Sequence, residues 1–433
     1  MATPVADLIR RVVGPEPPVA FQAYDGSRIG PVEAPATVVI RTPDALRRII
    51  TAPGELGLGR AYVAGDADIE GDIYSVLRLK DDLPSIKLGA SEVVAALQLV
   101  GISGLRPLTP PPEEARLRGW RHSKARDAAA ISHHYDVSND FYRLVLGDAM
   151  TYSCAVWTSL DSTLADAQAA KHELICRKLD LRPGMRLLDV GCGWGSMLMH
   201  AARYHGVEAV GVTISERQVE GARHRVEDAG LSDRVEIRLQ DYREVTDGPY
   251  DAISSVGMFE HVGAAKLLEY FTKMHALLRP AGRFLNHGIS RPPGGRSRFR
   301  RRGFIERYVF PDGELHEVGS VVSAIQQAGF EVRDVESLRE HYALTLRAWV
   351  ANLESNWDEA VAEVGEGRAR VWRIYMAGCA VGFEDGGIQI HQSLAVRTDK
   401  GRSGMALRRD WEREPLERQP IGAVGVNATR MPS

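Results

Sequence analysis

A glycine turn at the end of an apolar run is the segment of this chain most suited to chemistry. Residues 186–190 predict a buried strand, which runs into the pattern Asp189-x-Gly191-x-Gly193-x-Gly195. Glycines allow the backbone to approach a ligand closely, and the helix predicted over 196–205 begins at the same point. The pattern therefore predicts a small-molecule site at the end of this strand.

The turn does not match the dinucleotide fingerprint. That fingerprint needs a glycine at position 196, where the chain has Ser196, and an acidic residue after the next strand, which instead ends at Thr213. The pattern resembles that of S-adenosylmethionine-dependent methyltransferases, in which the loop surrounds the methionine part of the cofactor. We therefore predict S-adenosylmethionine as cofactor, with Asp189, Gly191 and Gly193 among the residues that bind it.

Short apolar strands alternate with helical segments through the centre of the chain. The predicted helices include residues 215–229 and 264–278, and the predicted strands are Arg186–Val190, Glu208–Thr213, Val235–Leu239, Tyr250–Val256 and Gly282–His287. Such alternation predicts an α/β fold with a mostly parallel, doubly wound sheet of the Rossmann-like class I methyltransferase type. Ligands in these sheets bind beyond the carboxyl ends of the strands.

Residues after the second and third strands are therefore further candidates for the cofactor site. Thr213, Ser215 and Gln218 follow the second strand, where the adenosine hydroxyls should lie. Asp241 and Tyr242 follow the third strand, in the position that usually faces adenine. For Gln218 and Tyr242 the alternative interpretation is an exposed helix or loop.

Three more segments narrow the prediction: His134–Tyr142, Met150–Trp157 and Gly257–Gly263. Together with Leu188–Gly195 they strongly resemble the cyclopropane-fatty-acid synthase family, which includes mycolic-acid methyltransferases and enzymes that place a methylene branch on acyl chains. The similarity covers about residues 120–395, and four motifs in order argue against a chance match. Gly59, Ala61-Tyr62 and Gly65-Asp66 also resemble the smaller N-terminal domain of the phospholipid-acting members.

The resemblance implies S-adenosylmethionine as methyl donor and a cis double bond of a phospholipid acyl chain as acceptor. An alkene is a weak nucleophile, so the site must hold the methyl sulfonium close and stabilise the resulting carbocation. In the family, a bound bicarbonate ion then removes a proton. The residues that match the bicarbonate site are Cys154, Glu260, His287, Ile289 and Tyr342, and Tyr135 and Ser138 match the donor site.

Each of these residues also has a purely structural interpretation. Cys154 in isolation would be a small buried hydrophobe, Glu260 a solvated cap, and Tyr342 a core aromatic of a helix. His287 is followed by Gly288, whereas a nearby family pattern is His-Thr-Ile-Gly, so the chain departs from that pattern at one position.

Composition excludes several other classes of protein. The 433 residues include 54 basic and 57 acidic side chains, so a net charge of −3 gives no general electrostatic case for nucleic acid. Four scattered cysteines with no C-x-x-C pair predict neither a disulfide framework nor a metal site. The first ten residues lack the features of a secretory signal, so we expect a cytoplasmic protein.

An arginine-rich segment follows the last predicted strand and is preceded by Pro292-Pro293-Gly294-Gly295. It also holds Phe299 and Phe304, and the candidates for cation–π stabilisation of the carbocation are Phe304 and Trp157. Its arginines are Arg291, Arg296, Arg298, Arg300, Arg301, Arg302 and Arg307. A solvated loop is the alternative, but we predict a mobile lid that contacts lipid phosphates, and hence peripheral association with the inner face of a membrane.

The prolines at 110–112 interrupt regular structure and predict a linker. We predict an N-terminal domain over 1–108, a linker over 109–119, a catalytic domain over 120–419 and a loose tail over 420–433. Within the first domain, a strand is predicted over 36–41 and a helix over 43–51.

Alternative functions require different residues at the site. A methyltransferase acting on oxygen or nitrogen of a small metabolite would leave Cys154, Glu260 and His287 without a joint task. A noncatalytic lipid-binding protein would not need competent side chains at every site position. Within the family, direct proton loss gives the expected cyclopropane, whereas a prior hydride shift gives a methylene branch, which a flavin-dependent reductase would saturate. A homodimer is compatible with the prediction.

Overall fold

The computed structural model describes residues 4–82, 94–95, 99, 101, 106–115, 138–294, 303–311 and 313–411. Contacts divide the chain into two compact units. Unit 1 comprises Met1–Gly147, Arg291–Leu315 and Arg339–Gln389, and unit 2 comprises Asp148–Ser290, His316–Leu338 and Ile390–Ser433. This division does not follow the linear domain boundaries predicted near 108 and 120, because helices of residues 339–389 pack with the N-terminal elements.

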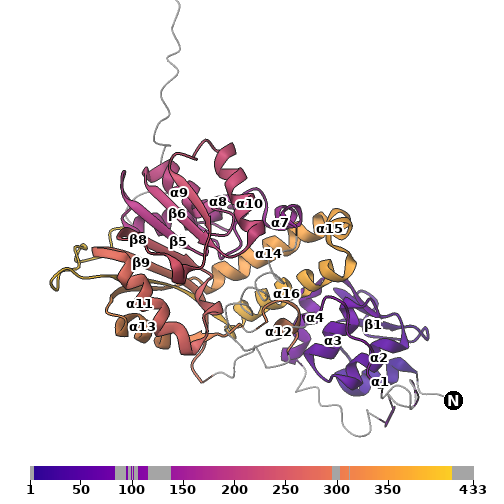
Figure 1. Cartoon of the computed structure of the whole chain (residues 1–433). Coiled ribbons are helices and arrows are strands. Elements are labelled where there is room, and N and C mark those ends of the chain that lie inside the picture. The colour runs from indigo at the N-terminus through magenta and orange to yellow at the C-terminus, as the bar shows by residue number, and fades with distance from the viewer. Residues whose placement is uncertain are drawn as a thin grey trace, which may run out of the picture. The chain divides into compact units, whose positions relative to one another are not determined.

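Unit 2 is built on a sheet whose strands run in the order β11-β12-β9-β8-β5-β6-β7, with β10 paired to β9. Figure 1 labels four of these strands, β5, β6, β8 and β9. The strands are β5 (Arg186–Val190), β6 (Glu208–Thr213), β7 (Val235–Leu239), β8 (Tyr250–Val256), β9 (Leu278–Arg291), β10 (His316–Glu317), β11 (Glu331–Ser337) and β12 (Gln389–Val396). The pairs β5–β6, β6–β7, β5–β8 and β8–β9 are parallel, and β11–β12 is antiparallel. The predicted α/β fold with a mostly parallel sheet is confirmed.

Helices cover both faces of this sheet because successive strand residues point to opposite sides. Leu187 of β5 belongs to one hydrophobic cluster and its neighbour Leu188 to another. The first cluster includes side chains of α8 (Leu164–Leu179), α9 (Ser196–His205) and α10 (Glu216–Asp228). The second includes side chains of α11 (Leu267–Leu277) and α13 (Val318–Gln327), so the sheet is doubly wound as predicted.

The predicted strands over 186–190, 208–213, 235–239 and 250–256 coincide with β5 to β8. β9 is longer than the predicted strand over 282–287, because it continues through Pro280 and through Ala281, whose φ is +60°. The segment predicted as one helix over 264–278 forms a short 3-10 helix, Ala264–Lys266, followed by α11.

Unit 1 contains a sheet in the order β2-β1-β3-β4 and a set of helices from distant parts of the chain. The strands are β1 (Ala20–Ala23), β2 (Arg28–Ile29), β3 (Ala36–Ile40) and β4 (Ala67–Gly71). The helices are α1 (Val5–Val13), α2 (Pro43–Thr51), α3 (Glu55–Val63), α4 (Ile73–Asp82), α7 (Asn139–Leu146), α12 (Phe304–Tyr308), α14 (Arg339–Ser355), α15 (Trp357–Val364) and α16 (Glu366–Glu384). The predicted strand over 36–41 and helix over 43–51 correspond to β3 and α2.

Gly59 of α3 has a packing role that the sequence motif did not reveal. A Cβ atom at Gly59 would lie only 2.2 Å from Cδ2 of Phe304, so only glycine leaves room for this ring. The Phe304 ring also stacks on Tyr308, with centroids 4.7 Å apart, and the residue is buried. Phe304, a candidate for cation–π stabilisation, is therefore used within unit 1 for packing α12 against α3.

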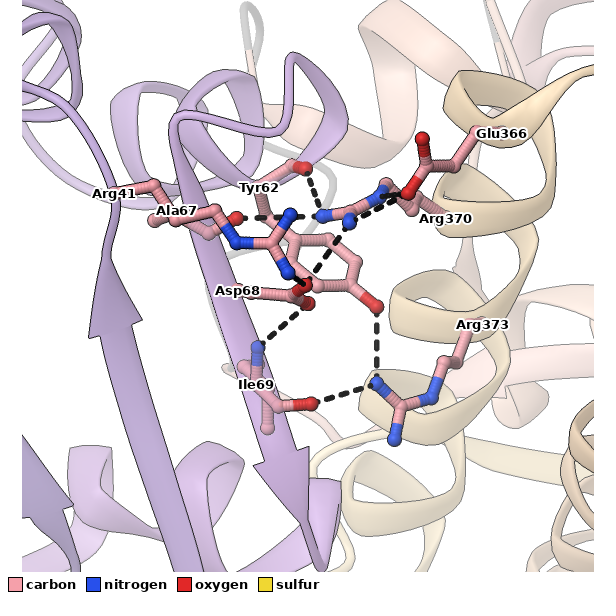
Figure 2. Close-up of polar contacts among 8 residues, drawn as sticks. All are labelled: Arg41, Tyr62, Ala67, Asp68, Ile69, Glu366, Arg370 and Arg373. Carbon is pink, nitrogen blue, oxygen red and sulfur yellow. Dashed lines mark hydrogen bonds and ion pairs between the residues drawn. The ribbon is translucent and has the colours of Figure 1, made fainter.

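Arginines of α16 connect this helix to α3 and β4 (Figure 2). Arg370 donates to the backbone oxygens of Tyr62 and Ala67, at 3.0 and 3.3 Å, and to the carboxylate of Asp68 at 3.0 Å. It also contacts Glu366 one turn earlier, and its side chain is only 5% exposed. The guanidinium thus has an acceptor on several sides, an arrangement that a planar fork of donors can satisfy.

Arg370→Lys is expected to destabilise the protein although the positive charge is kept. An ammonium cannot reach these acceptors together, so buried oxygens lose their partners, at a cost of about 2 to 4 kcal/mol in the free energy of unfolding. Urea unfolding followed by tryptophan fluorescence measures this cost. The control is Arg41→Lys, because Arg41 contacts the same Asp68 carboxylate from a 48% exposed position and should cost less than about 1 kcal/mol. Equal costs for the two variants would contradict this explanation.

Candidate active site

The glycine turn after β5 has the backbone conformation that its sequence suggests. Gly191, Gly193 and Gly195 have φ values of +78°, +54° and +78°, which side-chain-bearing residues rarely adopt. The Gly191 N–H donates to the Val212 oxygen at 2.9 Å, and a Cβ at Gly191 would lie 3.2 Å from Cβ of Met258. The turn therefore places backbone without side chains at the N-terminus of α9, and this backbone can approach a ligand closely.

Asp189 precedes this turn and is buried at the end of β5. Its Oδ1 accepts a hydrogen bond of 2.6 Å from the Ser254 hydroxyl of β8. Burial raises the pKa of Asp189 to about 6, and the Ser254 hydrogen bond and the charge of Lys171 act in the opposite direction. Asp189 is thus held rigidly beside the predicted donor loop.

The residues predicted after β6 lie together. The Thr213 hydroxyl donates to Gln218 Oε1 at 2.7 Å, and the Ser215 hydroxyl caps α10 by accepting from the Gln218 N–H at 3.3 Å. All three residues are buried, so the interpretation of Gln218 as an exposed helix residue is wrong. Since β5 and β6 are parallel neighbours, this group lies at the same edge of the sheet as the glycine turn.

Asp241 and Tyr242 follow β7 at that edge. Asp241 Oδ1 accepts from the backbone N–H and the Nε of Arg243, at 2.9 and 2.8 Å. The ring of Tyr242 meets the edge of Tyr270, with centroids 5.0 Å apart. Tyr242 is half-buried, so its ring is positioned by aromatic packing rather than lying in a free loop.

Glu260 and Ile289, two residues of the predicted bicarbonate site, are in direct contact. Oε1 of Glu260 accepts a hydrogen bond of 2.6 Å from the Ile289 N–H. The other oxygen, Oε2, is buried and has no hydrogen-bond partner among the residues that the structure describes. Burial raises the pKa of Glu260 to about 7, although the Ile289 N–H partly opposes this.

Gly288 lies between His287 and Ile289, where the chain departs from the family pattern. A Cβ at this position would lie 1.9 Å from Cε1 of Phe259. The Phe259 ring therefore occupies the space that a side chain at position 288 would need, which explains the glycine.

His287 is buried on β9, two residues before Ile289. Its Nδ1 lies 3.1 Å from Nε2 of Gln392, and its own Nε2 has no partner among the described residues. Burial is the main cause of a pKa well below the ordinary histidine value, and the charges of Lys171 and Lys178 lower it further. The imidazole is therefore neutral and offers one nitrogen to a bound group.

Cys154 is completely buried in unit 2. Its Sγ lies 3.2 Å from the Ala155 oxygen and 3.6 Å from the Leu338 oxygen, so the thiol acts as a donor to backbone. Burial raises the pKa of Cys154 well above its usual range. The group is thus a thiol and not a nucleophilic thiolate.

Sequence reasoning missed the buried polar residues of α8 and β12. Lys171 is buried, and its Nζ donates to the Ser153 hydroxyl at 3.0 Å. Burial lowers the pKa of Lys171 to about 7, while the nearby Asp189 and Cys154 favour its charged form. The available signal was the spacing of Lys171 and Lys178, which are two turns apart and so share one face of α8.

Two further predicted residues lie in unit 1, and one lies outside the described residues. Tyr342 is buried on α14, with its ring centroid 4.7 Å from Phe383 and 6.0 Å from Trp349. The Ser138 hydroxyl caps α7 by accepting from the Phe141 N–H at 3.0 Å. Tyr135 is not among the described residues.

Of the arginines in the predicted lid, the structure describes Arg291 and Arg307, which lie at its two ends. Arg291 donates to the Leu315 oxygen at 3.2 Å, and Arg307 lies 3.5 Å from the Glu114 carboxylate. The arginines from 296 to 302 lie outside the described residues. In the described part of the chain, no helix is both long and apolar enough to cross a membrane.

No metal was predicted, and within the described residues one group has suitable spacing. The ligand atoms of Cys176, His200 and His205 lie within 4.8 Å of one another. Both histidines already contact Oε2 of Glu173, at 3.3 and 2.9 Å. Both histidines are thus engaged with one carboxylate oxygen.

Comparison with known proteins agrees with this geometry. Residues 122–393 match the family model described as mycolic acid cyclopropane synthetase. The chain is 46% identical to a Mycobacterium tuberculosis protein named "Probable fatty acid methyltransferase", over 91% of this chain and 95% of that one. It is 36% identical to the cyclopropane-fatty-acyl-phospholipid synthase of Escherichia coli, over 84% of this chain and 88% of that one.

Solved structures show the same relationship. The Mycobacterium tuberculosis cyclopropane synthase MmaA2 is 33% identical with a TM-score of 0.60, and the match covers 64% of this chain and 99% of that one. The mycolic acid cyclopropane synthase CmaA1, solved with S-adenosylhomocysteine (SAH) and CTAB, is 36% identical with a TM-score of 0.58, over 62% of this chain and 98% of that one. The resemblance inferred from the four motifs is confirmed, and the chain belongs to the mycolic acid cyclopropane synthetase family of S-adenosylmethionine-dependent methyltransferases that modify lipid acyl chains.

Proposed function

We propose that this enzyme methylates the cis double bond of an unsaturated phospholipid acyl chain and, with bicarbonate as general base, closes a cyclopropane ring. The observation that carries the proposal is that two residues of the predicted bicarbonate site each have a buried polar atom without a partner among the described residues, Glu260 Oε2 and His287 Nε2, while Glu260 Oε1 binds the Ile289 N–H. Buried polar atoms normally have partners, so such a pair in a described site suggests a bound polar group.

The chemistry of this pair fits an oxyanion that carries one hydroxyl group. His287 Nε2–H can donate to a negatively charged oxygen, and an ionised Glu260 can accept from a hydroxyl. The charged form of Lys171 acts on His287, so protonation of this lysine would offset the burial of an added negative charge. Bicarbonate has both an anionic oxygen and a hydroxyl, and when bound it would supply the base that removes a proton from the alkylated chain.

Binding of the methyl donor depends on the glycine turn. S-adenosylmethionine, when bound, supplies an electrophilic methyl group. Gly191 and Gly193 leave the backbone open for close approach, and Asp189, Thr213 and Ser215 hold the surrounding loop ends in place. A rigid and largely buried site raises the rate mainly through positioning and the exclusion of water.

The test is incubation of the purified protein with methyl-labelled S-adenosylmethionine and vesicles of oleoyl phospholipid. Released acyl chains are then examined by mass spectrometry and NMR. We expect a mass gain of one CH2 per modified chain, cyclopropane resonances, and slower turnover in bicarbonate-depleted buffer. Labelled small metabolites with unmodified acyl chains would instead show a methyltransferase of the oxygen or nitrogen type.

A methylene branch is the second candidate product. It is favoured by the 46% identity to the protein named a fatty acid methyltransferase and by 33% identity to a "Tuberculostearic acid methyltransferase" of Mycobacterium tuberculosis. The same residues would serve, because a hydride shift before proton loss is the only difference. Exocyclic methylene resonances in the same NMR experiment would establish this product, and a flavin-dependent reductase would then be the expected partner.

Substitution of arginines in the 291–307 segment tests whether the protein binds membranes. Replacement of Arg298, Arg300 and Arg301 by Ser is expected to weaken binding to anionic vesicles, more at low salt than at high salt, because salt screens charge attraction. Sedimentation with vesicles at two salt concentrations measures this. The charge-matched control replaces the exposed Arg11, Arg217 and Arg234. An equal loss in both triple variants would mean that the segment has no specific role.

A further inference from the structure

A buried chain of hydrogen bonds leads from α8 through β12 to His287. Lys178 Nζ is 2.9 Å from Gln392 Oε1, 2.5 Å from Glu336 Oε2 and 3.3 Å from Asp334 Oδ2. The Lys178 side chain has no exposed surface. An ammonium group can only donate. It donates to Gln392 Oε1 and Glu336 Oε2, and the Asp334 carboxylate forms an ion pair with it.

The donor character of Lys178 determines the orientation of the Gln392 amide. Because Lys178 can only donate, the Gln392 atom that faces it must be the carbonyl oxygen. The amide nitrogen therefore faces His287 and lies 3.1 Å from Nδ1. An amide nitrogen donates and does not accept, so Nδ1 of His287 must be the acceptor.

This contact in turn determines the tautomer of His287. A neutral imidazole that accepts at Nδ1 carries its proton on Nε2. Protonation of Nδ1 would bring two donors face to face in a buried place. Nε2 is the nitrogen without a partner among the described residues, so its hydrogen points to whatever the site binds.

We propose that Lys178 and Gln392 are positioning residues that hold His287 as a permanent Nε2–H donor and prevent it from accepting a proton during turnover. The inference rests on the proposed function, in which His287 contacts an oxyanion. In that role His287 neither gains nor loses a proton, so the proton released by the acyl chain goes to the anion. A histidine free to change tautomer would offer the anion a lone pair in part of the molecules.

The tautomer can be measured without any turnover. We expect the 15N spectrum of ring-labelled histidine in the unliganded protein to show Nε2 protonated and Nδ1 unprotonated from about pH 6 to about pH 8. The His287 signals are assigned by their absence in His287→Gln. A wild-type His287 that carries its proton on Nδ1, or that titrates in this range, would overturn the proposal whatever the activity.

Substitution of Gln392 tests the functional consequence. In Gln392→Glu the carboxylate can accept from both Lys178 and His287 Nδ1–H, so the proton should move to Nδ1. We expect kcat to fall about 100-fold, as when one oriented donor is removed from a catalytic site, while the Kd for S-adenosylmethionine stays within about twofold. Gln392→Met, which loses both hydrogen bonds, should show both tautomers and a smaller fall in kcat.

The control is Gln389→Glu, the same change in the half-buried first residue of the same strand. It should alter neither the tautomer nor kcat. Full kcat in Gln392→Glu with the proton on Nδ1 would overturn the positioning role. A wild-type enzyme insensitive to bicarbonate depletion would instead contradict the proposed base, and the tautomer measurement would still decide the proposal about Lys178 and Gln392.

Discussion

Replacement of Glu260 by Gln is expected to remove most of the catalytic activity and at the same time to stabilise the protein at pH 8. Loss of an oriented acceptor in a buried site should raise the barrier by about 2 to 4 kcal/mol, which is about 30-fold to 1000-fold in rate. The amide oxygen can still accept from the Ile289 N–H, so the local fold is kept.

The stability effect follows from the raised pKa of Glu260, about 7 in the folded protein against 4.5 for an unperturbed group. Between these two values the folded state binds more protons than the unfolded state, so stability falls as the pH rises through this window. The amide of the Glu260→Gln variant cannot ionise and avoids this cost. We expect a gain of about 1 to 3 kcal/mol in the free energy of unfolding at pH 8, and little gain near pH 4.

Urea unfolding at the two pH values and single-turnover kinetics measure these effects. The matched control is Glu269→Gln, because Glu269 is exposed and contacts only Lys266 among the ion pairs of the described residues. Bicarbonate depletion should slow the wild type and have little further effect on Glu260→Gln. A variant with full turnover would show that Glu260 is not part of the base site, and a variant less stable at pH 8 would contradict the assigned cost of burial.

Gly191→Val is expected to abolish binding of S-adenosylmethionine. The φ of +78° at Gly191 is strained for any side-chain-bearing residue, and the new Cβ would press on Met258 at 3.2 Å. The turn must then move away from the ligand, so the Kd measured by calorimetry should rise more than about 100-fold, equivalent to about 3 kcal/mol.

Gly184→Val separates backbone strain from loss of the site. Gly184 has a φ of +81°, nearly the same as Gly191, and lies before β5 rather than after it. Both variants should lose stability through backbone strain, but only Gly191→Val should lose the cofactor. Normal cofactor affinity in a folded Gly191→Val protein would mean that the cofactor binds elsewhere.

The strands β5 to β8 could be predicted well because short apolar runs there are bounded by Gly, Pro and charged residues, whereas β10, β11 and β12 were not predicted. β9 was predicted too short, since Pro280 and the positive φ of Ala281 lie inside it. Helix ends were also predictable where a cap is encoded: α10 begins after Ser215, whose hydroxyl binds the Gln218 N–H. Local patterns of this kind need no knowledge of tertiary packing.

The polar support of the site could not be predicted in the same way. A lysine on a helix is usually exposed, and the burial of Lys171 and Lys178 appears only when α8 packs against the sheet. Gln392 is 105 residues from His287 in the chain, and no local pattern connects them. Motifs indicated which groups face a ligand, whereas the groups that orient them became visible only through long-range contacts.

The arginines of α16 also protect an edge of the N-terminal sheet. β4 is the last strand in the order β2-β1-β3-β4, and Arg370 and Arg373 bind the oxygens of Ala67 and Ile69, which alternate along it. Unpaired edge strands are templates for pairing with another chain. Because Arg370 follows Ala67 by 303 residues, this edge remains unpaired for roughly 15 to 60 s during ribosomal synthesis. Until α16 is made, the nascent N-terminal sheet has an unpaired edge that a chaperone would have to cover.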